Sequence, residues 1–167
     1  MSDAAPNPIK AAIVGGGVIG GGWAARFLLH GWDVAVFDPH PDTLERIAEV
    51  LSNARQSLPA LADVPMPVEG EITFVDSLAD AVHGATWIQE SVSEDLALKH
   101  AVLAEIQVHA REDAIIGSST SGFKPSELQE AASDPSQILV AHPFNPVYLL
   151  PLVEVVAGPA GDAERTA

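Results

Sequence analysis

The stretch IKAAIVGGGVIGGGWAA, residues 9–25, decides the fold. Ile9 to Val14 is a short apolar run rich in β-branched residues, as expected of a strand buried on both faces of a parallel sheet. Glycines 15, 17 and 20 then form a G-x-G-x-x-G turn, and Trp23 to His30 is predicted as a helix that ends at Gly31. A turn placed between a strand and a helix in this way is typical of dinucleotide-binding proteins.

The rest of the chain continues the alternation of strands and helices. Further strands are predicted at 33–37, 72–75, 86–89, 114–117, 137–141 and 152–156, and helices at 43–57, 78–82, 95–110 and in a segment that Pro125 opens. Strands that alternate with helices are joined by right-handed crossovers. The sequence therefore predicts an α/β fold of the Rossmann type, a doubly wound, mostly parallel sheet with helices on both faces and ligands at the carboxyl ends of its strands.

The glycine turn is the predicted cofactor site. Its first glycine makes the bend, its second lets a pyrophosphate approach the backbone, and its third lets the helix pack on the sheet. Asp38 follows the 33–37 strand, 18 residues after Gly20, where a carboxylate accepts hydrogen bonds from ribose hydroxyls and repels a 2′-phosphate, so NAD is expected. Alternatively, Asp38 only caps the turn 38–41. The predicted cofactor-binding residues of the turn are Gly15, Gly16, Gly17, Val18, Ile19 and Gly20.

Composition excludes several classes of function. The 167 residues carry 23 acidic and 8 basic side chains, a formal net charge of −15, and no cysteine. This charge disfavours nucleic acid and anionic membranes as partners, and the missing cysteines exclude disulfides and thiolate chemistry. Asp38, His40 and Asp42 lack further ligands, so no metal is expected. Residues 1–8 are predicted to be a flexible tail, not a secretory signal, and the expected compartment is the cytoplasm.

His142 is the candidate catalytic residue. It directly follows the 137–141 strand, at the edge where ligands bind, whereas His30, His40, His83, His100 and His109 are expected to be solvated. Glu154 follows within an apolar strand, where a buried carboxylate would need a partner. If the chain between them folds back, Glu154 can orient His142 as a general base. Alternatively, His142 bonds a loop carbonyl and Glu154 caps an edge strand. The hydroxyl run 118–121 either binds a substrate oxygen or makes a turn.

Together these stretches resemble the 3-hydroxyacyl-CoA dehydrogenase superfamily, over nearly the whole chain. Within it, three further stretches most resemble the members that dehydrogenate L-carnitine. The superfamily likeness rests on 15–22, 90–94, 118–121, 142–146 and 152–156, and the closer likeness on 22–26, 121–126 and 145–152.

The resemblance implies roles for individual residues. His142 would remove the proton of a 3-hydroxyl as hydride leaves C3 for the nicotinamide, and Glu154 would stabilise the imidazolium. Ser121 and Asn145 align with positions that bind the reacting oxygen and the nicotinamide end, and Glu90 with one near the nicotinamide ribose. The family also has a second, helical domain that closes the site and forms a homodimer. Residues 9–167 are therefore expected to be an NAD-binding domain that stops before the helical domain.

The segment 42–70 favours a small substrate. It is short, broken by prolines and carries five acids against two arginines and no lysine, so it suits a CoA polyanion poorly. A trimethylammonium substrate would suit it better, with Lys124 meeting the substrate carboxylate. Cation–π partners would come from Phe123, Phe144 and Tyr148, although these aromatics could instead pack under the loop and Lys124 could be a solvated helix start.

The leading hypothesis is NAD-dependent oxidation of the 3-hydroxyl of L-carnitine to 3-dehydrocarnitine. Two alternatives stay open. The first is a dehydrogenase of another small 3-hydroxy acid, such as L-gulonate, and the second is a non-catalytic NAD-binding fragment.

Overall fold

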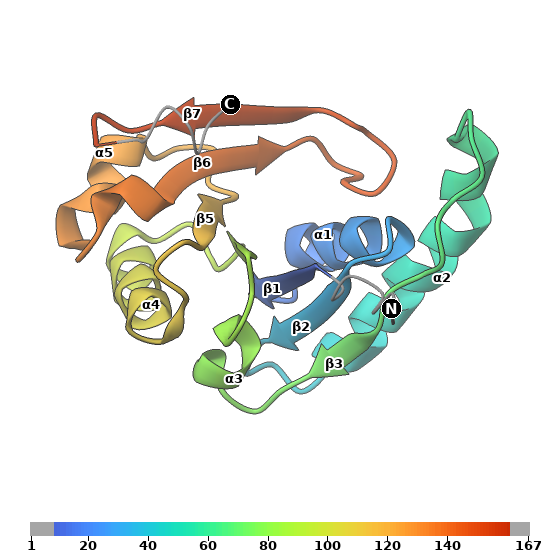
Figure 1. Ribbon diagram of the computed structural model, residues 1–167, viewed down its shortest axis with the longest axis horizontal. Coiled ribbons are helices and arrows are strands. Elements are labelled where there is room, and N and C mark those ends of the chain that lie inside the picture. Colours follow the sequence, from blue (N-terminus) through green and yellow to red (C-terminus); the bar gives the residue numbers. More distant parts are fainter. Residues whose placement is uncertain (1–8, 161–167) are drawn as a thin grey trace, which may run out of the picture.

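The computed structural model describes residues 9–160, so the predicted tail at residues 1–8 lies outside the described residues (Figure 1). Seven strands form one sheet in the order β3-β2-β1-β4-β5-β6-β7. Strands β1 to β6 are parallel, and β7 runs antiparallel to β6. The strands are β1 (Lys10–Val14), β2 (Asp33–Phe37), β3 (Ile72–Phe74), β4 (Trp87–Glu90), β5 (Ile115–Ser118), β6 (Ile138–Pro143) and β7 (Val153–Ala157).

Helices cover both faces of the sheet. One core cluster joins α1 and α2 to the side chains of one face, and a second joins α3, α4 and α5 to the other. The doubly wound α/β prediction is therefore confirmed. The helices are α1 (Val18–Leu29), α2 (Thr43–Leu61), α3 (Leu78–Val82), α4 (Leu96–His109) and α5 (Pro125–Leu128), and two short 3-10 turns, Gln129–Ala131 and Pro135–Gln137, precede β6.

Most predicted boundaries lie within one or two residues of the observed ones, but α1 and α2 differ more. Helix α1 begins at Val18 instead of Trp23, because the later glycines of the turn already belong to it and let it pack closely. Helix α2 continues past the predicted end at Ser57 to Leu61 and contains Pro59. The proline weakens only the last turn, which the buried Leu58 holds against the core.

The last strand departs from the expected environment. Four of the five residues of β7 are exposed, including Val155 and Val156 at about half of their maximum area. The prediction of a buried carboxylate at Glu154 was therefore wrong, because β7 is the edge strand of the sheet. Its backbone pairs with β6 on one side only.

Two kinds of feature are absent from the described residues. Within residues 9–160, every helix is either too short or too polar to span a bilayer. The same residues contain no group of three or more histidine and acidic side chains placed to hold a metal ion.

Candidate active site

A cavity of about 340 Å³ lies at the carboxyl ends of β1, β2 and β4. Since β2 and β4 flank β1 and their crossovers lie on opposite faces, this is the point where the strand order reverses. Polar and backbone groups come from Gly15, Gly17, Asp38 and Ser91, and apolar walls from Phe37, Pro39, Val92, Leu98 and Val102. An apolar slot beside a glycine turn fits an adenosine next to a pyrophosphate.

The glycines of the turn fit the predicted cofactor. Gly15 has a φ of +98°, a conformation that L side chains rarely adopt. A Cβ at Gly17 would meet nothing within 4 Å, so the backbone there is open to a ligand, whereas a Cβ at Gly20 would collide with the Gly15 carbonyl. Helix α1 begins at Val18, directly after Gly17, and presents its amino terminus to the glycine turn. This cradle suits the diphosphate of NAD.

Asp38 takes part in both arrangements that the sequence left open. Its Oδ2 accepts a hydrogen bond of 2.6 Å from the Gly16 N–H, and its Oδ1 accepts one of 2.7 Å from the His40 N–H. The side chain thus caps the turn after β2 and also ties that turn to the glycine loop. It lines the cavity as well, with carboxylate lone pairs left for a ribose.

A second cavity, of about 310 Å³, is lined by three of the candidate catalytic residues, His142, Glu154 and Ser121. His142 and Glu154 face each other in the antiparallel register of β6 and β7. His142 Nδ1 lies 3.1 Å from Glu154 Oε2, which leaves Nε2 available to another group. The pair is partly solvated, with side-chain exposures of 27% and 62%. Ser121, Phe123 and Lys124 line the same cavity, so the structure brings these five predicted residues together.

The remaining predicted residues of the 144–148 loop lie outside the lining of this cavity. The Phe144 ring meets the His142 ring edge-on, with centroids 5.7 Å apart. Asn145 is exposed and precedes Pro146 through a cis peptide bond. Tyr148 packs against the core cluster beneath α1 and α2. Of the predicted aromatic partners, only Phe123 lines the cavity, and it also packs on the opposite core cluster.

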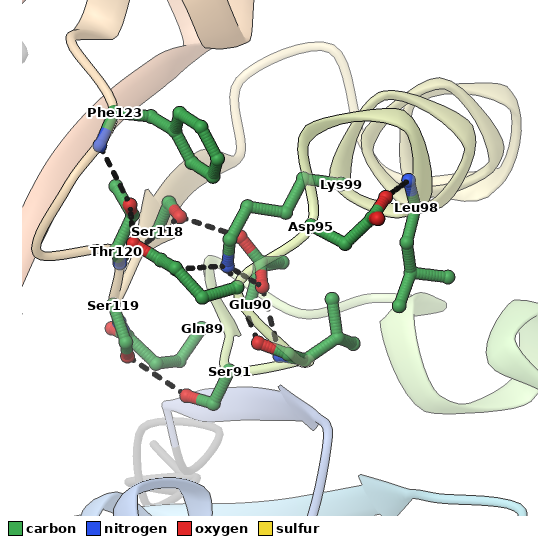
Figure 2. A network of polar contacts seen from close by, with 12 residues as sticks. Gln89, Glu90, Ser91, Asp95, Leu98, Lys99, Ser118, Ser119, Thr120 and Phe123 are labelled. Carbon is green, nitrogen blue, oxygen red and sulfur yellow. Dashed lines mark hydrogen bonds and ion pairs between the residues drawn. The ribbon is translucent and has the colours of Figure 1, made fainter.

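Glu90, which the resemblance places near the nicotinamide ribose, lies inside the fold. Its side chain is fully buried, because its carboxylate binds three partners inside the fold (Figure 2). Oε1 accepts from Lys99 Nζ at 2.9 Å and from the Val92 N–H at 2.8 Å, and Oε2 accepts from the Ser118 hydroxyl. The carboxylate thus takes part in a buried network of polar contacts, and its role near a nicotinamide ribose stays a prediction.

Lys99 and Glu94 are functional candidates that the sequence reasoning missed. Lys99 is 1% exposed and lies between Glu90 and Glu94, with its Nζ 3.3 Å from Glu94 Oε2. A signal was present, because Lys99 occurs three residues after Leu96 and four before Leu103, on the inward face of its helix. A lysine on that face requires a buried partner.

Glu94 holds the loop that carries Ser121. Its Oε1 accepts hydrogen bonds from the Thr120 hydroxyl and from the backbone N–H groups of Ser121 and Gly122. Burial by itself raises the pKa of Glu94, but these hydrogen bonds and the Lys99 charge outweigh it and lower the pKa below its ordinary value. The carboxylate is therefore ionised at neutral pH and fixes the loop at the cavity.

One other histidine differs from its expected environment. His100 is partly buried, and its Nε2 donates a 2.6 Å hydrogen bond to the Glu127 carbonyl instead of being solvated.

Comparison with known sequences identifies the family. Residues 10–167 match the family described as 3-hydroxyacyl-CoA dehydrogenase, NAD binding domain. The chain is 64% identical over 154 residues to an L-carnitine dehydrogenase/betainyl-CoA thioesterase of Ruegeria pomeroyi, a match that covers 92% of this chain and 32% of that protein. It is 54% identical over 150 residues to an L-carnitine dehydrogenase of Mesorhizobium japonicum, a match that covers 89% of this chain and 41% of that protein. The chain thus spans less than half the length of these relatives.

Solved structures agree with this assignment. The crystal structure of an NAD+-dependent dismutase, 5-formyl-3-hydroxy-2-methylpyridine 4-carboxylic acid 5-dehydrogenase, superposes with a TM-score of 0.86 at 32% identity, covering 95% of this chain and 52% of that one. The structure of a 3-hydroxyacyl-CoA dehydrogenase of Archaeoglobus fulgidus superposes with a TM-score of 0.76 at 27% identity. This match covers 93% of this chain and 49% of that one. With the glycine cradle, these matches establish NAD as the cofactor. The chain belongs to the 3-hydroxyacyl-CoA dehydrogenase family and carries its NAD-binding domain.

Proposed function

We propose that this chain is the NAD-binding part of an L-carnitine dehydrogenase, which oxidises the 3-hydroxyl of L-carnitine to the ketone of 3-dehydrocarnitine. The observation that carries the proposal is the His142–Glu154 pair in one cavity with Ser121 and Lys124. An oriented imidazole can deprotonate the hydroxyl of a hydroxy acid, while a neighbouring serine hydroxyl and lysine can bind its oxygens. The relatives named L-carnitine dehydrogenase supply the choice of acid.

Each residue of the site has its own role in the proposed oxidation. Bound NAD supplies the acceptor for the hydride of C3. His142 Nε2 takes the proton of the 3-hydroxyl, since Nδ1 is held by Glu154. Glu154 then stabilises the imidazolium by its negative charge and fixes the ring orientation. The Ser121 hydroxyl donates to the reacting oxygen, and its loop is held in place by Glu94.

Recognition of the substrate ends uses groups around the cavity. Lys124 is exposed at its rim and would bind the carboxylate of carnitine. The Phe144 ring lies beside the His142 ring and would offer a cation–π surface to a trimethylammonium group. Asn145, in the same loop, would contact the nicotinamide end. The acidic surface and the absence of lysine in 42–70 disfavour an acyl-CoA substrate.

Substrate comparison tests the proposal. NADH formation by purified protein carrying this sequence is followed at 340 nm with L-carnitine, L-gulonate and 3-hydroxybutyryl-CoA. We expect the highest kcat/KM with L-carnitine, and a faster reaction with either of the others would refute the choice of substrate.

A substitution separates an enzyme from a binding module. His142→Gln should lower kcat by about 100-fold or more, because removing a general base removes that much acceleration, while NAD+ affinity measured by calorimetry stays the same. If no protein carrying this sequence forms NADH with any of the three substrates while NAD+ binds, the chain is a non-catalytic nucleotide-binding module.

We further propose that the protein acts in the cytoplasm as a homodimer. Sedimentation measurements on the purified protein test the dimer, and fractionation of the source cells tests the compartment.

A further inference from the structure

A chain of hydrogen bonds runs from Trp87 to the dinucleotide cavity through Gln89, Ser119 and Ser91. Figure 2 shows Gln89, Ser119 and Ser91 of this chain. Gln89 lies on the central strand β4 and is fully buried. Trp87 Nε1 lies 2.9 Å from Gln89 Oε1, Gln89 Nε2 lies 2.9 Å from Ser119 Oγ, and the two serine hydroxyl oxygens are 2.8 Å apart. Ser91, the last member, lines the cavity.

Both ends of the Gln89 amide are fixed by groups that have only one hydrogen-bonding role. An indole N–H can only donate, so the amide oxygen must face Trp87. The Ala141 carbonyl can only accept, and it lies 3.4 Å from the amide nitrogen. The amide therefore cannot be flipped, and its second N–H donates to Ser119 Oγ.

The serine pair can continue the chain in the same direction. Ser119 Oγ accepts from Gln89, which leaves its single hydrogen to donate. Within residues 9–160, the acceptor in reach of that hydrogen is Ser91 Oγ. Either hydroxyl of the pair can be the donor. When Ser119 donates to Ser91, the Ser91 hydrogen has no acceptor among the described side chains and carbonyls and is free for a ligand oxygen in the cavity. The chain delivers a hydroxyl donor to the cavity.

The packing shows that this path is built into the sheet. Gly117 on β5 leaves room for the Gln89 amide and the Trp87 indole. A Cβ at Gly117 would lie 2.8 Å from the Trp87 ring and 3.2 Å from Gln89 Oε1. At the other end, the backbone of Ser91 packs against the glycine turn, 2.7 Å from where a Cβ of Gly15 would be. Ser91 is therefore held beside the diphosphate cradle.

We infer that the Ser91 hydroxyl donates a hydrogen bond to an oxygen in the ADP half of the bound dinucleotide. This rests on the NAD assignment and adds a binding residue to it. The ADP half is indicated because Ser91 shares its cavity with Gly15, Gly17 and Asp38. A donor is what phosphate and ribose oxygens require, and Gln89 is the positioning residue that fixes its direction.

Binding measurements on this chain test the inference. Calorimetry with NAD+ and with ADP should show that Ser91→Ala weakens both ligands by the same factor, about 5- to 10-fold, the effect of one hydrogen bond. Ser57→Ala is the matched control, because that hydroxyl is hydrogen-bonded within α2, to the Asn53 carbonyl, and its affinities should equal wild type. Unchanged affinities in Ser91→Ala, or a loss for NAD+ alone, would overturn the inference.

Gln89→Glu tests the direction of the chain. A carboxylate still accepts from Trp87 but cannot donate to Ser119, so both serine hydroxyls must turn inward and the cavity loses its donor. We expect the same fold-loss as in Ser91→Ala and no further loss in the double variant; an additive loss would refute the directed chain. If Gln89→Glu does not fold, the Ser91→Ala result still decides. Wild-type chain that binds no NAD+ would instead overturn the cofactor assignment itself.

Discussion

At the scale of single residues, Asp38 combines two roles whose contributions can be separated. Its carboxylate accepts from the backbone of the glycine turn and faces the cavity. Asp38→Asn keeps an acceptor oxygen for one of the two N–H groups but removes the charge that excludes a 2′-phosphate. We expect NAD+ affinity to fall by about 10-fold, the range for a hydrogen bond to a charged group, and NADP+ affinity to stay level or rise. Calorimetric titration with both dinucleotides measures this, and an equal loss for both would refute the ribose assignment.

Replacing Lys99 tests how much the buried ion pair contributes to the stability of the fold. Lys99→Met should lower the free energy of unfolding by about 3–5 kcal/mol, because it leaves the buried carboxylate of Glu90 without its cation. Urea denaturation followed by circular dichroism measures the loss. Lys124→Met is the control, since that lysine is exposed, and it should change stability by less than about 0.5 kcal/mol.

The pairing itself is tested by removing both charges. Glu90→Gln combined with Lys99→Met should recover part of the lost stability, because no uncompensated charge then remains in the core. A double variant less stable than Lys99→Met alone would contradict the ion-pair explanation.

At the scale of elements, the loop between β6 and β7 is docked on α1. Val147 is 2% exposed and fills the notch left by Gly22, while Arg26 of α1 donates a 3.4 Å hydrogen bond to the Tyr148 carbonyl. The helix that begins at the dinucleotide cradle thus also positions the loop that holds Phe144 and Asn145.

Gly22→Ala tests this docking. The new Cβ would lie 2.8 Å from the Val147 Cβ, so the loop must move, at a cost of about 1–3 kcal/mol. Gly21→Ala is the matched control on the same helix, since its Cβ meets nothing closer than 3.4 Å and alanine favours the helix. Thermal unfolding should show Gly22→Ala destabilised and Gly21→Ala equal to or above wild type. Equal effects of the two substitutions would exclude docking through Val147.

The elements also show which features the sequence could predict. Strands β1 and β2 and the glycine turn were predictable because local composition and tertiary role agree there. The end of α2 was not, since packing of Leu58 outweighs the local effect of Pro59. The exposure of β7 depends on its place at the sheet edge, which no local pattern encodes.

The candidate site divides in the same way. His142 was predictable as a residue at a strand end, and its register with Glu154 follows from a hairpin-like return of the chain. The buried contacts of Glu90 and Lys99 could not be predicted, because they form only when β4, β5 and α4 come together.

At the scale of the whole molecule, net charge opposes folding. Acidic side chains outnumber basic ones by 15 in the sequence. The described arginine–carboxylate pairs are partly solvated, such as Arg55–Glu69 and Arg111–Asp113, and each such pair contributes little. The excess of negative charge is repulsive, and Glu45 and Glu49 repel each other directly, since they are exposed and one turn apart on α2.

Screening by salt should therefore stabilise the protein. Raising NaCl from 10 to 150 mM shortens the Debye length from about 30 to about 8 Å, which should raise the melting temperature by roughly 2–4 °C, equivalent to about 1 kcal/mol. Differential scanning calorimetry in the two buffers measures the shift. Replacing Glu45 and Glu49 together by glutamine should raise the low-salt melting temperature and reduce the effect of salt, because part of the repulsion is already gone. A melting temperature that falls with NaCl would mean that the attractive ion pairs outweigh the net charge.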